Sequence, residues 1–351
     1  MQAAKRGIIL MNLGSPDSTE VKDVHRYLMQ FLMDKRVIDY PYLFRKVLVG
    51  GIIVPFRAGK SAEAYRTIWT KDGSPLVAIT RDLQALLQPL VSEPVEIAMR
   101  YGNPSMQTAY KKLLERMPDM EEVLAIPMYP HYAMSSYETA VEWAREIHRR
   151  KKYKFRLAFI KPFYNNPAYI EALSERIRPY VEKDYDHILF SYHGIPERHL
   201  RKTDLTGKHC LASATCCENS SIAHQKCYRH QCFETTRLVA KKLGLDPHKM
   251  SISFQSRLGR EQWLTPYTDF RLKEMPSEGI KNLLVLCPAF VSDCLETLEE
   301  IQIRGKESFF ESGGEEFAMI PCLNVQPKWV QTLAGWIQDH KAGEKNMILE
   351  D

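Results

Sequence analysis

The sequence places one histidine and a pair of carboxylates where each could act on a proton or a metal ion. His193 follows the apolar run 188–190 and precedes a turn of glycine and proline, a pattern typical of a buried strand that ends at a sheet edge. Glu296 and Glu300 lie four residues apart and share one face of a helix, where like charges repel. Repulsion and burial in a cleft would raise a carboxyl pKa toward neutrality, as proton transfer requires.

Structural roles explain the same residues without chemistry. A lone histidine at a strand end is more often a core or turn residue with one satisfied hydrogen bond. Asp293 and Glu296 have the spacing of a capping box, in which Glu296 would be a structural carboxylate in the first helical turn. The apolar stripe from Leu295 to Ile301 would nevertheless leave Glu296 and Glu300 beside the buried face.

Strands and helices that position these residues alternate along the chain, and several strands end in polar clusters. The expected strands are 7–11, 95–99, 123–128, 188–190, 252–254 and 283–290. Such alternation predicts an α/β fold with parallel sheets flanked by helices, and ligands that bind beyond the carboxyl ends of the strands. A second capping box, Ser135 with Glu138, is expected to begin the helix that runs to about residue 148.

The two halves of the chain resemble each other in the order of their strands and loops. At 351 residues the chain is long enough for two domains. We expect two similar Rossmann-like, doubly wound domains. The first comprises residues 1–161 with 325–351, which return as a C-terminal helix, and the second comprises residues 162–324. The cleft between two such domains is the default ligand site.

Composition is ordinary for a globular protein, with 44% hydrophobic and 26% charged residues and a net charge of +5. The mild basic excess suits an anionic ligand or a membrane surface, and no nucleic-acid-binding motif is present. The first residues lack a signal-peptide core, so we expect a cytoplasmic protein whose cysteines do not form a disulfide framework.

Residues 31–57 combine bulky apolar side chains with Lys35, Arg36, Arg45 and Lys46. No run there reaches the roughly 18 apolar residues that span a bilayer. Composition alone favours neither of two interpretations of this stretch. The stretch is a lip that enters a membrane interface and meets anionic lipid with its cations, or it is a helix and strand packed under the sheet.

Several sequence blocks together resemble the signature blocks of ferrochelatases. They are Met11–Gly14, Met99–Pro104, Tyr129–Tyr132, Ser191–Pro196, Gln255–Arg257 with Trp263 and Leu264, and Ser292–Glu299. The resemblance covers nearly the whole chain in the same order, apart from one insertion.

The resemblance implies that the protein inserts Fe²⁺ into a porphyrin held in the inter-domain cleft and so forms haem. His193 would accept a proton from the macrocycle or contact the metal, and Glu296, with Glu300 behind it, would handle protons or deliver iron. Neutral imidazole and carboxylate suit Fe²⁺ without enclosing it. Positions that contact the porphyrin in the family correspond here to Leu13, Arg57, Tyr65, Ser74, Arg100, Tyr101, Ser256 and Trp263. The stretch 31–57 corresponds to the family's membrane-facing lip.

Two positions depart from the family pattern. Cys294 stands where many members have a histidine, so a second imidazole is missing. Leu13 stands where the coproporphyrin-using branch carries a tyrosine, which favours protoporphyrin IX as the substrate. Coproporphyrin or Co²⁺ as the substrate stays an alternative, because a fold alone does not select a metal.

Five of the eight cysteines lie in an insertion at about residues 200–232. Cys232 falls where some cluster-free family members also have cysteine, which leaves Cys210, Cys216, Cys217 and Cys227 as the added set. Four thiolates within 18 residues suit a [2Fe–2S] cluster, with Cys232 as the alternative ligand. The spacing is unlike common zinc patterns, yet zinc and plain structural thiols stay open, as do His209, His224 and His230 as ligands.

A function of another class also fits these features: an iron–sulfur sensor that keeps a porphyrin-binding cleft without turnover. Retention of both His193 and Glu296 favours the enzyme, because a binding protein needs no proton acceptor. We expect peripheral association with the cytoplasmic face of the inner membrane, and assembly as a homodimer stays open.

Overall fold

The computed structural model of the chain describes residues 5–259 and 261–350. It contains two compact units. The first comprises Met1–Tyr129, Met134–Pro162 and Pro327–Asp351, and the second comprises Pro130–Ala133 and Phe163–Gln326. Each unit has a sheet of its own, so each is described by itself.

The sheet of the first unit has five strands in the order β2-β1-β3-β4-β9. Neighbours are parallel except β9, which pairs antiparallel with β4. The two inner strands β1 and β3 are almost wholly buried, as expected when helices cover both faces of a parallel sheet. The strands are β1 (Arg6–Ser15), β2 (Val95–Gly102), β3 (Glu122–Pro127), β4 (Arg156–Ile160) and β9 (Ile348–Glu350).

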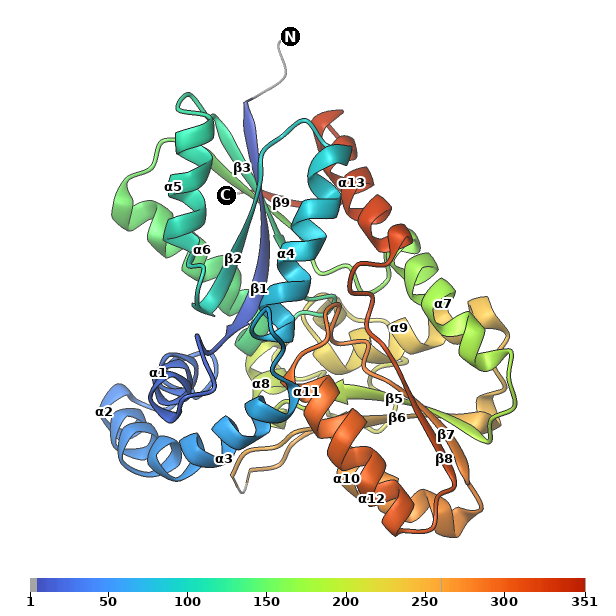
Figure 1. Ribbon diagram of the computed structural model, residues 1–351. Helices are drawn as coiled ribbons and strands as arrows, with labels where there is room; N and C mark the ends of the chain where they lie inside the picture. The colour runs from blue at the N-terminus through green and yellow to red at the C-terminus, as the bar shows by residue number, and fades with distance from the viewer. Residues whose placement is uncertain (1–4, 260, 351) are drawn as a thin grey trace. The chain divides into compact units, whose positions relative to one another are not determined.

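Helices cover both faces of this sheet, with α5 and α6 on one side and α4 and α13 on the other (Figure 1). Helices α1 to α3 lie beyond the carboxyl end of β1. The α-helices are α1 (Val21–Leu32), α2 (Tyr42–Lys46), α3 (Val54–Ile68), α4 (Pro75–Leu87), α5 (Met106–Arg116), α6 (Thr139–Lys151) and α13 (Pro327–Lys341). Two π-helical segments, Val47–Ile53 and Met134–Glu138, and the 3₁₀ turn Gln88–Leu90 connect them.

The second unit has a parallel sheet in the order β6-β5-β7-β8. Its strands are β5 (His187–His193), β6 (Met250–Gln255), β7 (Asn282–Leu286) and β8 (Glu316–Ile320). The α-helices are α7 (Pro167–Val181), α8 (Glu197–Thr203), α9 (Tyr228–Leu243), α10 (Thr268–Glu274), α11 (Leu295–Thr297) and α12 (Lys306–Glu311). The π-helix Leu298–Gly305 joins α11 to α12, and 3₁₀ turns occur at Ile222–Gln225, Pro247–Lys249 and Met275–Glu278.

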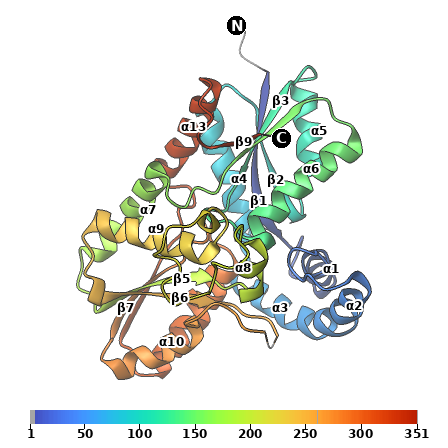
Figure 2. The same cartoon turned by 180° about the vertical axis from the view of Figure 1, so that it is seen from behind.

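Strand order in the second unit creates a point where consecutive connections diverge. From β5 the chain passes through α8 and α9 to β6 on one side, and from β6 it crosses to β7 on the other side of β5. Helices α9 and α10 accordingly lie on opposite faces of the sheet, and α8 begins just beyond the carboxyl end of β5 (Figure 2). Ligands of doubly wound sheets bind at such a switch point, so the ends of β5 and β7 are where chemistry is expected.

The expected fold class is confirmed, because both units have parallel sheets flanked by helices on the two faces. The capping box expected at Ser135 is wrong. Residues 134–138 already form a π-helical turn, and Glu138 accepts a hydrogen bond from Arg36 at 3.0 Å. The Glu138 carboxylate, which the local sequence pattern predicted as a helix cap, therefore pairs with a distant arginine instead.

Residues 42–68 are helical, so the strand considered for this stretch does not form. Of the cations Lys35, Arg36, Arg45 and Lys46, two are held by contacts within the protein. Arg45 is buried and donates to the carbonyls of Ile38 and Tyr40 at 3.0 and 2.9 Å, and Arg36 pairs with Glu138. Across the described part of the chain, no helix has both the length and the apolar character needed to cross a membrane.

Candidate active site

His193 is the last residue of β5, and its ring is held by a local hydrogen bond. Its Nδ1 lies 2.6 Å from the carbonyl oxygen of Gly194. A carbonyl only accepts, so Nδ1 carries the proton and Nε2 keeps its lone pair for a proton or a metal ion. The Tyr228 hydroxyl on α9 donates to the His193 carbonyl at 2.8 Å, which fixes the strand end that carries the ring.

Gly194 lets the end of β5 approach the end of β6. Its amide donates to the Gln255 carbonyl at 2.6 Å. A Cβ at this position would lie 2.9 Å from the Ser256 carbonyl oxygen and 3.0 Å from that of Gln255. Because a side chain has no room there, the sequence needs glycine directly after the histidine.

Glu300 lies in the π-helix after β7 and is bound by Ser256, the residue that follows β6. The Ser256 amide donates to one carboxylate oxygen at 3.0 Å, and its hydroxyl donates to the other at 2.5 Å. Ser256 has a φ of 59°, in the left-handed region that costs a non-glycine residue of order 1–3 kcal/mol and is typical of functional sites. This conformation is what aims both donors at one carboxylate.

Burial raises the pKa of Glu300 above its ordinary value, and the charge of Glu296 acts in the same direction. The Ser256 hydrogen bond and the nearby His193 act in the opposite direction. Hydrogen bonds link the segments that carry the three residues: Gly194, next to His193, bonds to Gln255, the Gln255 side chain bonds to the Glu296 carbonyl, and Ser256 bonds to Glu300. The structure therefore places the three predicted catalytic residues on segments that meet at the ends of β5, β6 and β7.

Glu296 does not cap its helix, so the Asp293–Glu296 capping box considered as its structural role does not form. The box that forms is one residue further along, where the Cys294 amide donates to Thr297 Oγ1 at 3.0 Å and the Thr297 amide bonds to the Cys294 side chain. Asp293 instead accepts from Asn324 Nδ2 at 2.6 Å. The Glu296 carboxylate is thereby left available for other contacts.

Cys294, at the position where many family members have histidine, contacts Glu296 directly. Burial raises the pKa of the Cys294 thiol well above its usual range, and Glu296 adds to the effect through its charge and a side-chain hydrogen bond. Both effects favour the protonated thiol beside the Glu296 carboxylate. Glu299, the third acid of this segment, is bound at both carboxylate oxygens by Arg304, at 2.6 and 2.9 Å, and serves structure.

Gln255 joins the three strand ends and was missed by the sequence analysis. Its Nε2 donates to the Glu296 carbonyl at 2.8 Å, and its Oε1 accepts from Ser191 at 2.9 Å and from Cys287 at 3.4 Å. One buried amide thus connects β5, β6 and the segments after β7. Its place in the block Gln255–Arg257 was the available signal, although a glutamine at a strand end has no single chemistry to indicate it.

Of the predicted porphyrin contacts, Ser256 and Trp263 belong to the second unit. Trp263 packs against Gly194, and its indole donates to the Leu258 carbonyl at 3.1 Å. The other six contacts belong to the first unit. Among them, Leu13 is half-buried in β1, Tyr65 and Ser74 are buried, and Arg57 is exposed on α3. Within the described residues, the Arg57 guanidinium forms no hydrogen bond or ion pair.

Arg100 and Tyr101, by contrast, are held by an internal carboxylate. Arg100 forms an ion pair with Asp34 and donates to Thr139 Oγ1 at 2.8 Å, and its guanidinium stacks on Trp143 at 4.6 Å. The Tyr101 hydroxyl donates to Asp34 at 3.0 Å, and burial raises its pKa. Asp34 is a second residue that the sequence analysis did not identify.

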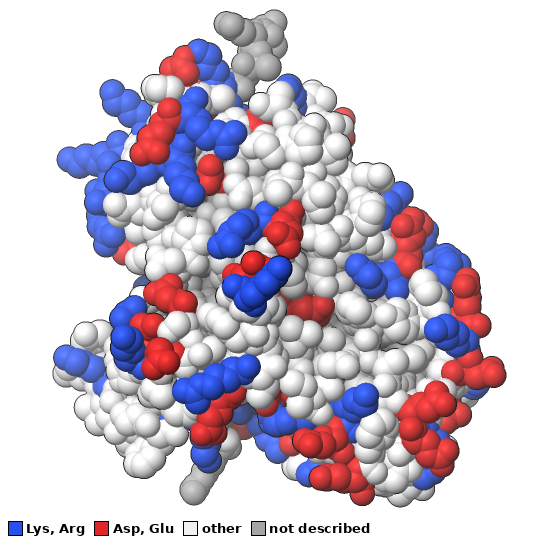
Figure 3. Space-filling model, viewed as in Figure 1, with Lys and Arg blue, Asp and Glu red and all other residues white. Residues whose placement is uncertain are grey.

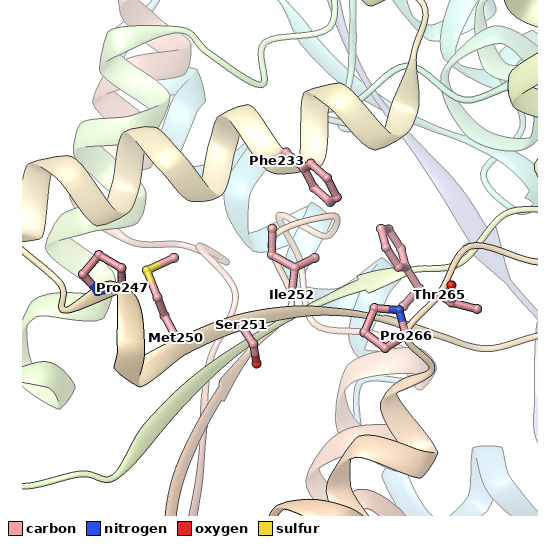
Figure 4. Close-up of a pocket in the computed structure, with 8 residues that line it drawn as sticks. Phe233, Pro247, Met250, Ser251, Ile252, Thr265 and Pro266 are labelled. Carbon is pink, nitrogen blue, oxygen red and sulfur yellow. The ribbon is translucent and has the colours of Figure 1, made fainter. Parts of the chain in front are cut away.

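Two cavities occur among the described residues, one in each unit. One of about 270 Å³ lies between α9 and the edge strand β6, with Phe233 and Ile252 facing it and Met250 at one end (Figure 4). Another of about 580 Å³ lies in the first unit and is lined by Arg100 and Trp143. Neither is lined by His193, Glu296 or Glu300.

The four cysteines of the insertion are all buried although much of the surrounding chain is exposed. Hydrogen bonds from Cys217 and then Cys210 lower the pKa of Cys227 to about 6. Arg229 Nη1 lies 3.8 Å from the Cys216 sulfur. Cys232 lies on the core side of α9, where burial raises the pKa of its thiol well above the usual range, and it bonds to Tyr228.

The chemistry of this donor set fits a thiolate-bound iron–sulfur group, because cysteine sulfurs are the usual ligands of such groups and the Arg229 guanidinium beside the Cys216 sulfur can offset negative charge. In the described ranges, no three or more His, Cys, Asp or Glu side chains are arranged to hold a metal ion. Among the described residues the four thiols are therefore not arranged as a ready metal-binding group.

Comparison with known proteins decides the family. The ferrochelatase family model matches residues 5–341. This chain belongs to the ferrochelatase family. It is 49% identical over 329 residues to the ferrochelatase of Pseudomonas fluorescens strain Pf0-1, covering 93% of this chain and 96% of that protein. It is 50% identical over 340 residues to the ferrochelatase of Opitutus terrae, covering 95% and 98%. Ferrochelatases insert ferrous iron into a porphyrin, and this chain is such an enzyme.

Solved structures agree on the fold. The protein SirB from Bacillus subtilis with Fe³⁺ aligns with a TM-score of 0.55 at 11% identity and covers 98% of both chains. The sirohydrochlorin chelatase SirB from Bacillus subtilis subspecies spizizenii, in complex with cobalt, aligns with a TM-score of 0.54 at 10% identity, covering 98% of this chain and 99% of that one. At such identities the likeness concerns the fold alone.

Replacement of Ser256 should change the pH dependence of this ferrochelatase. Ser256→Ala removes the hydroxyl that stabilises the charged form of Glu300, so the pKa of Glu300 rises further. A proton acceptor must be deprotonated, so the acid limb of the kcat/KM profile should move to higher pH while the rate at high pH is retained. Ser251→Ala, on the same strand but bonded to His187, is the matched control. An acid limb identical in both variants would contradict the role of Glu300.

Proposed function

We propose that this ferrochelatase inserts Fe²⁺ into protoporphyrin IX, with His193, Glu296 and Glu300 acting on one face of the macrocycle. The observation that carries the proposal is the convergence of the three side chains at the switch point of the second unit. His193 has an Nε2 lone pair there, and Glu300 has a raised pKa influenced by both partners.

The reaction must remove two pyrrole protons as the metal enters. His193 Nε2 is the proposed first acceptor. Glu300 is the proposed next acceptor, since a carboxylate with a raised pKa holds a proton more firmly than an ordinary one. Imidazole and carboxylate are suitable transient ligands for Fe²⁺, so His193 and Glu296 would contact the ion before transfer. Cys294 would orient the Glu296 carboxylate through its thiol.

Arg57 is the proposed partner of a porphyrin propionate, because its guanidinium is exposed and can pair bidentately with a carboxylate. Leu13, Tyr65, Ser74, Arg100, Tyr101, Ser256 and Trp263 stay as proposed contacts. Apolar Leu13 favours protoporphyrin IX, which carries two vinyl groups where coproporphyrin carries two propionates. Faster turnover of coproporphyrin than of protoporphyrin IX, or of Co²⁺ than of Fe²⁺, would support the alternative that the enzyme is a coproporphyrin or cobalt chelatase.

His193→Ala should reduce haem formation by at least about 100-fold, the lower bound for loss of a general base, while porphyrin binding persists. Iron insertion is measured anaerobically with Fe²⁺ and protoporphyrin IX, and binding is measured by porphyrin fluorescence. His248→Ala, at an exposed histidine of the same unit, is the control and should behave as the parent. Turnover that survives in His193→Ala would refute the mechanism.

We further propose that Cys210, Cys216, Cys217 and Cys227 hold a [2Fe–2S] cluster, with a structural or sensing role because metal insertion needs no electron transfer. The support is the burial of all four thiols, with Cys227 bonded to Cys217 and Cys210, in a segment with little apolar content to order it. Zinc bound by the same thiols is the alternative, and a coloured protein without turnover would favour a sensor.

Cys227→Ser should abolish the red-brown absorbance of anaerobically purified protein, whereas Cys232→Ala should retain it, because Cys232 bonds to Tyr228 within the core. The visible spectrum and the iron and sulfide contents of both variants test this. Loss of colour in Cys232→Ala with retention in Cys227→Ser would reverse the ligand assignment. A colourless parent that contains zinc would replace the cluster with a zinc site.

We propose also that the α2–α3 region is a lip that contacts the cytoplasmic face of the inner membrane. Six large apolar side chains are exposed along it. They are Tyr42, Leu43, Phe44, Val47, Ile52 and Phe56. The surface over α2 shows few charged side chains (Figure 3). Lys35 and Lys46 are exposed beside it and would meet anionic headgroups.

The double variant Leu43→Ser and Phe56→Ser should weaken binding to vesicles of phosphatidylcholine and phosphatidylglycerol by tenfold or more, since each buried side chain of this size contributes about 1.5–3 kcal/mol. Phe270→Ser, at an exposed phenylalanine of α10, is the matched control and should bind as the parent does. Equal vesicle sedimentation of all three proteins would refute the lip.

A further inference from the structure

A strongly basic segment follows the middle of α6 in the first unit. Residues 145–156 contain seven cations and one carboxylate, Glu146. Two of the cations have partners, since Arg145 pairs with Glu142 at 2.9 Å and Arg156 pairs with Glu122 at 3.4 Å. The other five are exposed, and none of them forms an ion pair within the described residues. These five, the basic end of α6, are Arg149, Arg150, Lys151, Lys152 and Lys154.

The helix dipole accounts for only part of this charge. Cations offset the partial negative charge at a helix C-terminus, but only within the last turn. Residues 149–151 lie in that turn, whereas Lys152 and Lys154 follow it. Lys152 has a φ of 54°, in the left-handed region where glycine usually ends a helix, so a cation occupies this position at a conformational cost. Five unpaired like charges also repel one another, and an anionic partner would remove that repulsion.

The basic end of α6 lies at the edge of the sheet where the strands begin, because α6 leads directly into β4. Figure 3 shows Lys and Arg side chains gathered over this end of the unit. The α2–α3 region lies beyond the opposite end of β1 (Figure 1). The ten residues of β1 span roughly 33 Å at about 3.3 Å each. Attraction to lipid headgroups decays over a Debye length of about 8 Å, so a membrane held by the lip does not reach the basic end of α6.

The aromatic side chains of this segment are used inside the protein. His148 Nε2 lies 2.7 Å from the Phe155 carbonyl oxygen. The rings of Tyr153 and Phe155 stack with their centroids 5.2 Å apart and their planes 22° apart, and Phe155 is buried. Single-stranded nucleic acids are bound by stacking bases on exposed aromatic rings beside cations. A surface that offers charge without such rings suits the acidic surface of a protein, which is recognised through charge complementarity.

We propose that the basic end of α6 docks an acidic surface of a soluble partner protein. Docking there leaves the carboxyl ends of the strands and the lip of the first unit free, so the partner binds while the enzyme is on a membrane. The choice of a soluble partner rests on the proposed lip, whereas the unpaired charge does not. Exposed ion pairs are individually weak and are screened by salt, so the complex is transient and weakens as ionic strength rises.

Binding of a short fluorescent polyglutamate peptide to the full chain tests the surface, with fluorescence anisotropy measured at low and at physiological ionic strength. The triple variant Arg149→Gln, Arg150→Gln and Lys152→Asn should bind about tenfold more weakly at low ionic strength, since three exposed ion pairs are lost. Asparagine tolerates the left-handed conformation of residue 152, so the variant should fold and insert iron at the parent's rate.

The matched control removes the same charge from exposed cations of the second unit. It is the triple variant Arg178→Gln, Lys183→Gln and Lys241→Gln. This control should bind the peptide as tightly as the parent, because the attraction is local to the basic end of α6.

Three outcomes would overturn the proposal. Equal weakening in both triple variants would show that net charge alone attracts the peptide. Tighter binding of a single-stranded RNA than of polyglutamate, lost in the α6 variant, would make the partner a nucleic acid. Loss of sedimentation with phosphatidylcholine and phosphatidylglycerol vesicles in the α6 variant would place a membrane on this surface. That last result is distinct from failure of the lip, which is measured with the Leu43→Ser and Phe56→Ser variant.

Discussion

The proposed active site depends on keeping a carboxylate inside the protein at a strand end. Glu300 loses hydration there, which raises its pKa, and the two donors of Ser256 compensate by hydrogen bonding, aided by the charges of His193 and Arg304. Those donors meet the carboxylate because Ser256 adopts a left-handed backbone directly after β6. A residue in that conformation persists only when its surroundings fix it. The close approach of β5 to β6 at Gly194 supplies that constraint.

Other features of the second unit also help to hold the Glu300 carboxylate at the strand ends. Its parallel strands end at one edge of the sheet, and the divergent connections after β5 and β7 leave space there for side chains from both. Gln255 holds the segments together through the Glu296 carbonyl and Ser191. The π-helical turn that carries Glu300 is of the kind often found at functional sites.

Other carboxylates in the protein show how long-range contacts give acidic residues different structural roles. Asp34 binds Arg100 and Tyr101, so two residues expected at the porphyrin are held by a buried acid. Arg304 forms an ion pair with Glu299, whereas the neighbouring Glu300 accepts hydrogen bonds from Ser256. In each case a buried or half-buried charge needs a partner, and the partner fixes which side chains stay available for a ligand.

The amino-acid sequence alone determined the fold class, the family and most of the strands, because these depend on local apolar patterns and on motifs in a fixed order. It did not predict β4, β8 or β9, and it predicted His193 and the glutamate pair as the catalytic residues. The tertiary structure decided which partner each side chain has. The helix cap is formed by Cys294 and Thr297 rather than by Asp293 and Glu296. Gln255 bonds to Ser191 and to the Glu296 carbonyl. The His209 ring contacts the His224 ring. These contacts join residues whose approach depends on how the chain folds around them, and local pattern contains no information about that geometry.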